Sequence, residues 1–87
     1  MKCTIKIFGK EYSSTGNSVL ECLDNLEYKG FARTIAMLTI KDGKDEKTVV
    51  LPPRQTQRLF SASPLAKEIA VKQTAMRFPQ YVSRNNI

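Results

Sequence analysis

Within the first 26 residues, the spacing of the apolar side chains changes from every second residue to a helical repeat of 3.6 residues. Cys3, Ile5 and Ile7 alternate with polar residues, which is typical of a strand with one buried face. From residue 19 the apolar side chains recur instead at helical spacing: Val19, Cys22, Leu23 and Leu26. A strand followed so soon by an amphipathic helix restricts the chain to folds that combine a sheet with helices.

The signals around these two segments predict a hairpin and the limits of the helix. Gly9 and Lys10 have the composition of a tight turn, so residues 11–15 are expected to return as a second strand. Ser18 and Glu21 have the spacing of a capping box. We therefore expect a helix over residues 18–29, closed by Gly30 as its C-terminal cap.

A second hairpin is predicted over residues 34–51. Residues 34–41 are apolar on both faces, which is typical of a central strand. A four-residue loop after this strand would pair Lys41 with Glu46 and Leu38 with Val49. These pairs are better than those that a two-residue Asp42-Gly43 turn would produce, so we expect the longer loop.

Two further helices are predicted in the C-terminal part. Pro53 suits the first position of a short helix that runs to about residue 60. Ser63 and Pro64 begin another, which ends near Arg77 because Pro79 disfavours helical geometry in the residue before it. One face of this last helix carries larger apolar side chains: Leu65, Ile69 and Met76.

These elements predict an α+β fold with one small sheet, built from two β-hairpins in hairpin–helix–hairpin–helix order. The helices are expected to pack mainly on one face. Residues 1–78 form a single compact domain in this prediction, since 87 residues leave room for one core. Residues 79–87 are a C-terminal tail or a short edge strand. The order is β-grasp-like if residues 11–15 pair with the first strand, and ferredoxin-like if they are loop and the tail supplies the last strand.

The composition argues against an enzyme. The chain has no histidine, which removes the usual general base near neutral pH and histidine-ligated metals. Cys3 and Cys22 lack the spacing of a zinc site, and both fall on apolar faces, so we expect buried thiols. We therefore predict no catalytic residues, no cofactor, no metal and no small-molecule substrate. No signal peptide or membrane span is predicted, and the expected location is the cytoplasm.

One short segment is similar to part of an RNA-binding motif. Lys29–Ala32 matches the first four positions of the octapeptide of RNA-recognition motifs. The next positions, residues 33–36, carry no aromatic ring that could stack on a base. The match therefore does not by itself indicate RNA binding.

The charge is concentrated in the C-terminal part. Residues 1–51 hold eight Lys/Arg and seven Asp/Glu, a net of +1, and residues 52–87 hold six and one, a net of +5. Such a segment suits a polyanion, and nucleic acid is the partner it favours. The candidate phosphate-binding residues are Arg54, Arg58, Lys67, Lys72, Arg77 and Arg84. Arg54 and Arg58 lie four residues apart on a predicted helix, a pair that suits a phosphate or carboxylate; a solvated helix face is the alternative.

A second candidate surface lies on the sheet face that points away from the core. It combines an apolar centre with a basic rim: Lys6, Arg33, Ile35, Met37, Lys41 and Val50. The face is open if the helices pack on one side, and it is core if the C-terminal helix covers it. The sequence thus predicts a small non-enzymatic binding module, nucleic-acid-binding or nucleoprotein-associated through its basic C-terminal helical segment. The alternative is a protein-interaction module, such as an inhibitor, adaptor or homodimer subunit, that uses the sheet face.

Overall fold

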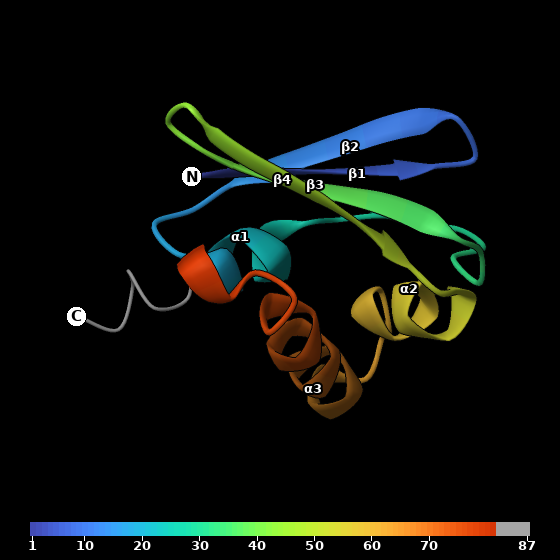
Figure 1. The fold of residues 1–87 in the computed structure, drawn as a ribbon. Helices are drawn as coiled ribbons and strands as arrows, with labels where there is room; N and C mark the ends of the chain where they lie inside the picture. The colour runs from blue at the N-terminus through green and yellow to red at the C-terminus, as the bar shows by residue number, and fades with distance from the viewer. Residues whose placement is uncertain (82–87) are drawn as a thin grey trace.

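The computed structural model describes residues 1–81 as a four-stranded antiparallel sheet with its helices on one face (Figure 1). The elements are β1 (Lys2–Ile7), β2 (Lys10–Thr15), α1 (Val19–Asn25), β3 (Ala36–Asp42), β4 (Asp45–Leu51), α2 (Pro53–Leu59) and α3 (Pro64–Ala75). The strand order is β2-β1-β3-β4. The predicted α+β class is confirmed. Of the two predicted arrangements, the observed one has residues 11–15 paired with the first strand.

The first hairpin turns one residue earlier than predicted. Ile7 pairs with Lys10, so the turn consists of Phe8 and Gly9 rather than Gly9 and Lys10. Both turn residues have positive φ, 51° for Phe8 and 79° for Gly9. That backbone has the twist that two-residue hairpins require. It is the usual conformation for glycine and an uncommon one for a bulky side chain such as Phe8.

The register of the second hairpin is the predicted one. Lys41 pairs with Glu46, Leu38 with Val49 and Met37 with Val50. The ladder continues for one more pair, Asp42 with Asp45, so the turn has two residues, 43 and 44, instead of four. The cross-strand pairs therefore determined the register, and Gly43, with φ 64°, allows the shorter turn.

Helix α1 starts as predicted and ends four residues early. The Ser18 hydroxyl accepts a hydrogen bond from the Glu21 amide at 3.1 Å, as in a capping box. The chain leaves helical geometry at Leu26, so Gly30 is not a helix cap. Residues 26–35 form a loop instead, because Leu26 and Tyr28 turn inward to pack against the core.

Helix α3 does not pack through the face that carries its larger apolar side chains. The apolar residues Leu65, Ile69 and Met76 are exposed. The buried side chains of α3 are small: Ala70, Val71, Thr74 and Ala75. Small side chains let α3 approach α2 closely, and there the Gln55 amide nitrogen donates to the Ala70 carbonyl at 3.1 Å and to Thr74 Oγ1 at 2.8 Å.

The core lies between the inward sheet face and the helices. Its largest fully buried side chains include Ile5, Ile7, Leu23, Leu26, Leu38, Ile40, Leu51 and Leu59. Phe78 and Tyr81 complete it beyond α3, where residues 79–81 form a helical turn rather than a strand. The remainder of the predicted tail, residues 82–87, lies outside the described residues. None of the helices within residues 1–81 has the length and apolar character needed to cross a membrane.

Candidate nucleic-acid interface

The loop over residues 26–35 is held in place by an aromatic cluster. The Tyr28 ring lies between the rings of Tyr12 on β2 and Phe60 after α2, with centroid distances of 5.0 Å and 5.5 Å. The Tyr28 hydroxyl donates a hydrogen bond to the Phe31 carbonyl at 3.2 Å. These contacts join the loop to a strand on one side and a helix on the other, and they fix the position of Phe31.

Phe31 and Phe8 form an exposed aromatic pair at this end of the molecule. Their ring centroids are 6.4 Å apart and their planes are inclined by 20°. The two side chains are 66% and 63% exposed, respectively. Two large apolar rings in water have no role in the core, and contiguous exposed apolar surface marks interaction sites. Phe8 also has the uncommon backbone conformation of the β1–β2 turn, and such outliers cluster at functional positions.

Arg58 of α2 lies beside Phe31, one member of this pair. Arg58 and Phe31 line the same surface hollow, of about 440 Å³, and none of its lining residues within the described part of the chain is acidic. Arg54 lies one turn away on α2 and is exposed, as is Arg33, two residues beyond Phe31. Neither Arg54 nor Arg58 forms an ion pair among residues 1–81, so both guanidinium groups remain available to an anion.

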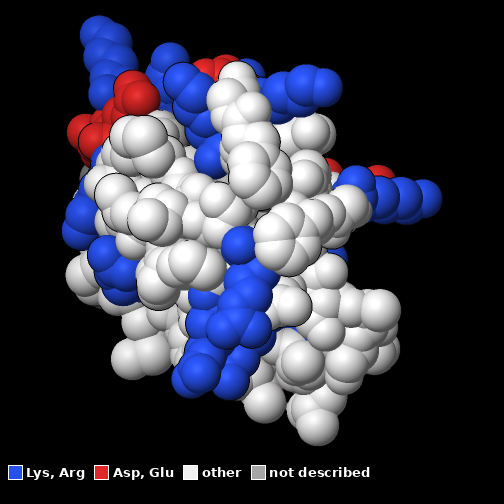
Figure 2. Space-filling view, turned by 90° about the vertical axis from the view of Figure 1, so that its right-hand side faces the viewer, with Lys and Arg blue, Asp and Glu red and all other residues white. Residues whose placement is uncertain are grey.

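Figure 2 looks at this end of the molecule. One group of lysine and arginine side chains lies below the middle of the view, and others lie at its left edge and across its upper part, where the acidic side chains are also found. The mixture of exposed aromatic rings and cations is the composition of surfaces that bind nucleic acids. We call this group the aromatic–arginine site: Phe8, Phe31, Arg33, Arg54 and Arg58.

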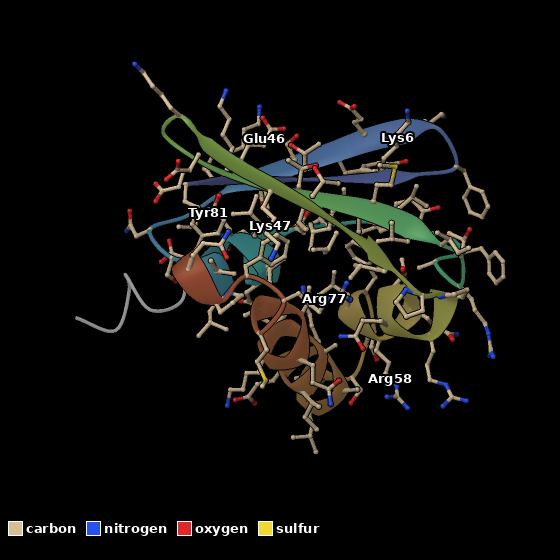
Figure 3. All side chains as sticks on the ribbon, in the orientation of Figure 1. Lys6, Glu46, Lys47, Arg58, Arg77 and Tyr81 are labelled. Atoms are coloured by element: carbon tan, nitrogen blue, oxygen red, sulfur yellow. The ribbon has the colours of Figure 1, made fainter. Side chains whose placement is uncertain are left out.

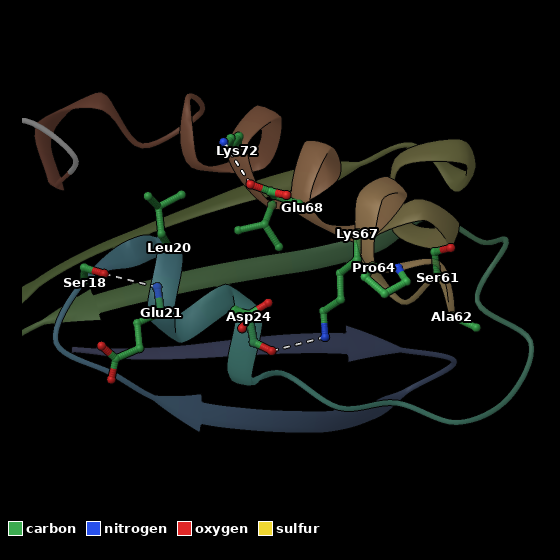
Figure 4. A pocket seen from close by; sticks show the side chains of 11 residues that line it. Ser18, Leu20, Glu21, Asp24, Ser61, Ala62, Pro64, Lys67, Glu68 and Lys72 are labelled. Carbon is green, nitrogen blue, oxygen red and sulfur yellow. Dashed lines mark hydrogen bonds and ion pairs between the residues drawn. The ribbon is translucent and has the colours of Figure 1, made fainter.

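The other predicted phosphate-binding residues do not join this site. Lys67 donates to the Asp24 carbonyl at 3.1 Å, and Lys72 pairs with Glu68 at 3.1 Å (Figure 4). Both line a hollow of about 720 Å³ between α1 and α3, where acidic side chains of both helices also lie. Arg77 is exposed after the end of α3, and Arg84 lies outside the described residues. The six predicted cations therefore do not form a single surface within residues 1–81.

The outward sheet face is open, as one of the two predicted arrangements required. Its middle row is not apolar: it consists of hydroxyl side chains, with Thr39 and Thr48 hydrogen-bonded at 2.7 Å. Met37 and Val50 face each other in the adjacent row and are 49% and 53% exposed. Lys6 belongs to the row of Met37, and Figure 3 shows it projecting from the sheet on the side opposite to Arg58. Ile35, just before β3, is exposed as well, and Lys41 is exposed near the far end of β3.

The two thiols are buried, as predicted. Cys3 Sγ donates to the Cys22 carbonyl at 3.2 Å, and Cys22 Sγ donates to the Met1 carbonyl at 3.1 Å. Burial raises the pKa of Cys3 to about 12 and also raises the pKa of Cys22, so neither thiol has thiolate character near neutral pH. Within the described residues, no three histidine, cysteine, aspartate or glutamate side chains gather closely enough to hold a metal ion.

Comparison with protein-family models, curated proteins and solved structures finds no match for this chain. The sequence predicted Arg54 and Arg58 as phosphate-binding residues and placed Arg33 on the rim of the sheet face instead, and Phe8 and Phe31 were not among the predicted site residues. The available signal was Phe8 next to Gly9: if this dipeptide forms the turn, an aromatic side chain is placed at a hairpin tip, where it cannot be buried in the sheet.

Proposed function

We propose that this protein is a small non-enzymatic module that binds nucleic acid through the aromatic–arginine site. The observation that carries the proposal is Arg58 beside Phe31, with the exposed Arg54 one turn away on α2; neither arginine has an acidic ion-pair partner among residues 1–81. A net charge of +6 adds attraction for a polyanion at longer range. Relative to the sequence prediction, the proposed site moves from the whole C-terminal segment to α2 and the loop before β3.

The geometry of the arginine pair supports phosphate as the ligand group. Arg54 and Arg58 are four residues apart on one helix, so their side chains lie on the same side of α2. Like charges at this spacing repel, and an anion between them relieves the repulsion. Guanidinium groups bind phosphate oxygens in a bidentate manner, which makes arginine more suitable than lysine at such a site.

Fluorescence anisotropy with labelled DNA and RNA tests the proposal. We expect binding that weakens steeply as salt rises from 50 to about 200 mM, because each phosphate contact releases counterions. The variant Arg54→Gln/Arg58→Gln should bind more weakly, and on single strands its salt slope should be smaller by about 1.4, at about 0.7 for each lost contact.

A control variant separates a local contact from the loss of net charge. Lys2→Gln/Lys44→Gln also removes two positive charges, at the opposite end of the sheet, where Lys2 begins β1 and Lys44 lies in the β3–β4 turn. It should retain most of the affinity. Equal losses in the two double variants would mean that only net charge attracts the polymer, and absence of binding at 50 mM salt would refute the proposal.

A second function, protein interaction through the open sheet face, is favoured by one observation. Met37 and Val50 lie opposite each other and expose about half of their surface on a face that no helix of residues 1–81 covers. Binding at such a surface would survive high salt and would be lost in Met37→Asp. A pull-down at 500 mM salt with wild-type and Met37→Asp protein tests this candidate, and capture that is equal for both proteins would count against it.

A further inference from the structure

We propose that the aromatic–arginine site selects unpaired nucleic acid, with Phe8 and Phe31 as the surface on which bases stack. This inference depends on the proposed function and adds to it the class of polymer. Base pairs in a duplex hide the faces of their bases, so only a single strand can place a base on an exposed ring. The arginines would then hold the backbone and the aromatic pair would recognise that the bases are free.

The exposure of the aromatic pair is the first argument. Phe8 and Phe31 are each more than 60% exposed although they are in contact with each other, so a large part of both rings faces water. A phenylalanine whose role is to close a core does not have this exposure. Stacking on exposed rings tolerates any base, because every base has a π-face.

The backbone at Phe8 is the second argument. Its φ of 51° is a conformation that glycine, asparagine or aspartate adopts more readily. The hairpin therefore carries a ring at a position where another residue would make a more stable turn. A site that uses the ring accounts for this choice, since strained backbone is retained where it positions a functional group.

The anchoring of Phe31 is the third argument. Its carbonyl accepts the hydrogen bond from the Tyr28 hydroxyl, and Tyr28 is held between Tyr12 and Phe60. Gly30, with φ 145°, passes so close to Tyr28 that a Cβ atom would lie 3.3 Å from its hydroxyl oxygen. The backbone that carries Phe31 is thus held in place before any ligand arrives, which lowers the entropic cost of binding.

Arg58 connects the stacking surface to the backbone contacts. It lines one hollow together with Phe31, and Arg54 and Arg33 are exposed on the two segments that meet there. A single strand stacked on the aromatic pair would have its phosphates within the reach of these cations. The same surface offers a duplex only the phosphate contacts, so a duplex should bind more weakly than a strand of equal length.

The experiment compares labelled 12-nucleotide single-stranded DNA, single-stranded RNA and the corresponding DNA duplex, all of mixed sequence, by fluorescence anisotropy. Phe8→Asn and Phe31→Ala should each weaken binding of the single strands at least about fivefold, which is the lower limit for losing one stacked base. Neither variant should change binding of the duplex or the salt slope. Leu65→Ala is the matched control, because it removes an equally exposed apolar side chain from α3.

A direct signal of stacking is available because the chain contains no tryptophan. In the Phe31→Trp variant, the added indole is the only one in the protein, and single strands should quench its emission while the duplex leaves it nearly unchanged. The DNA and RNA arms show whether the sugar matters, and binding of either single strand with quenching supports the inference.

The possible failures are distinguishable. If single strands and duplex bind equally, with losses in Arg54→Gln/Arg58→Gln and none in Phe8→Asn or Phe31→Ala, the stacking inference is overturned and the proposed function stands. If no polymer binds at 50 mM salt, the proposed function fails and the stacking inference fails with it. Losses in Leu65→Ala equal to those in Phe31→Ala would also overturn the inference, because the effect would not be local.

Discussion

Replacing Phe8 by asparagine should stabilise the fold while it weakens the site. The residue lies in the two-residue turn between β1 and β2, with φ 51°. For a residue with a bulky side chain, left-handed backbone costs about 1–2 kcal/mol. Asparagine tolerates this conformation and is among the preferred residues of such turns, so Phe8→Asn removes most of that cost.

The loss of the ring opposes this gain and can be estimated separately. Aromatic pairs contribute about 0.5–1.5 kcal/mol. The pair of Phe8 and Phe31 belongs at the lower end of that range, since both rings are more than half exposed. The difference leaves a net stabilisation of about 1 kcal/mol. In a domain of this size such a gain raises the Tm by about 4–8 °C.

Thermal and urea unfolding followed by circular dichroism give the measurement, with Phe31→Ala as the reference variant. Phe31→Ala breaks the same aromatic pair without changing the turn, so it should lower stability slightly, by about 0.5 kcal/mol. The double variant Phe8→Asn/Phe31→Ala should then be more stable than Phe31→Ala by about 1–2 kcal/mol, the full cost of the left-handed backbone at Phe8. If Phe8→Asn lowers the Tm as much as Phe31→Ala does, the turn stores no strain, and the backbone argument for a functional Phe8 is refuted.

Three further predictions test the packing of the fold. Gly16→Ala should lower the free energy of unfolding, measured in urea, by about 1–3 kcal/mol, because the added Cβ would lie 2.7 Å from the backbone nitrogen of Cys22. An unchanged free energy of unfolding in this variant would contradict the packing argument. The pKa of Cys3 is raised to about 12 in the fold and is about 8.5 in the unfolded chain, so its stabilising effect is complete below pH 8.5 and should decline by up to about 1.4 kcal/mol per pH unit above it. Urea unfolding at pH 8 and pH 10 should show this decline in wild-type protein and a smaller decline in Cys3→Ala, where Cys22, whose pKa burial also raises, remains. Gln55→Met should lower the free energy of unfolding in urea by about 1–3 kcal/mol, because the buried Thr74 hydroxyl loses the amide that donates to it. An unchanged free energy of unfolding would mean that α2 and α3 are joined by apolar packing alone.

The sequence predicted the parts of the fold that depend on neighbouring residues and on direct pairs. The Ser18 capping box began α1 at the correct residue, and the pairs of Lys41 with Glu46 and Leu38 with Val49 identified the register of the second hairpin. These signals are local or involve one partner strand, so a single sequence is sufficient to recognise them. The periodicity left open whether the C-terminal helix covers the second sheet face, and the structure places the helices of residues 1–81 on one face.

The errors occurred where tertiary contacts override local preference. Gly30 has the composition of a helix cap, but Tyr28 gains more by packing between Tyr12 and Phe60 than by extending α1 for another turn. The larger apolar residues Leu65, Ile69 and Met76 likewise do not indicate the buried face of α3, because close approach to α2 favours small residues such as Ala70. No periodicity shows which of two usable faces a neighbouring helix will accept.

The candidate site was difficult to predict for a related reason. Its residues come from the ends of elements: Phe8 from a turn, Phe31 and Arg33 from a loop, and Arg58 from the last turn of a short helix. Each of them is unremarkable in the sequence, and only the strand order and the Tyr28 anchor bring them together. Charge alone indicated the whole segment 52–87. In the fold, Lys67 and Lys72 contact partners on α1 and α3, whereas the α2 arginines form no ion pair within residues 1–81.

The interactions that each lysine or arginine makes therefore indicate the site better than the number of such residues in a segment does. Lys72 is neutralised by Glu68, and the Lys67 ammonium is held by a carbonyl, so a polyanion would have to compete for both. Arg54 and Arg58 have no such competitor within residues 1–81, and the neighbouring hollow has no acidic lining residue in that part of the chain. Arg58 has no acidic partner within residues 1–81 and lies beside Phe31, a ring that is not part of the core. The pair gains a role when a ligand supplies both a phosphate and a flat apolar face, and an unpaired nucleotide supplies both.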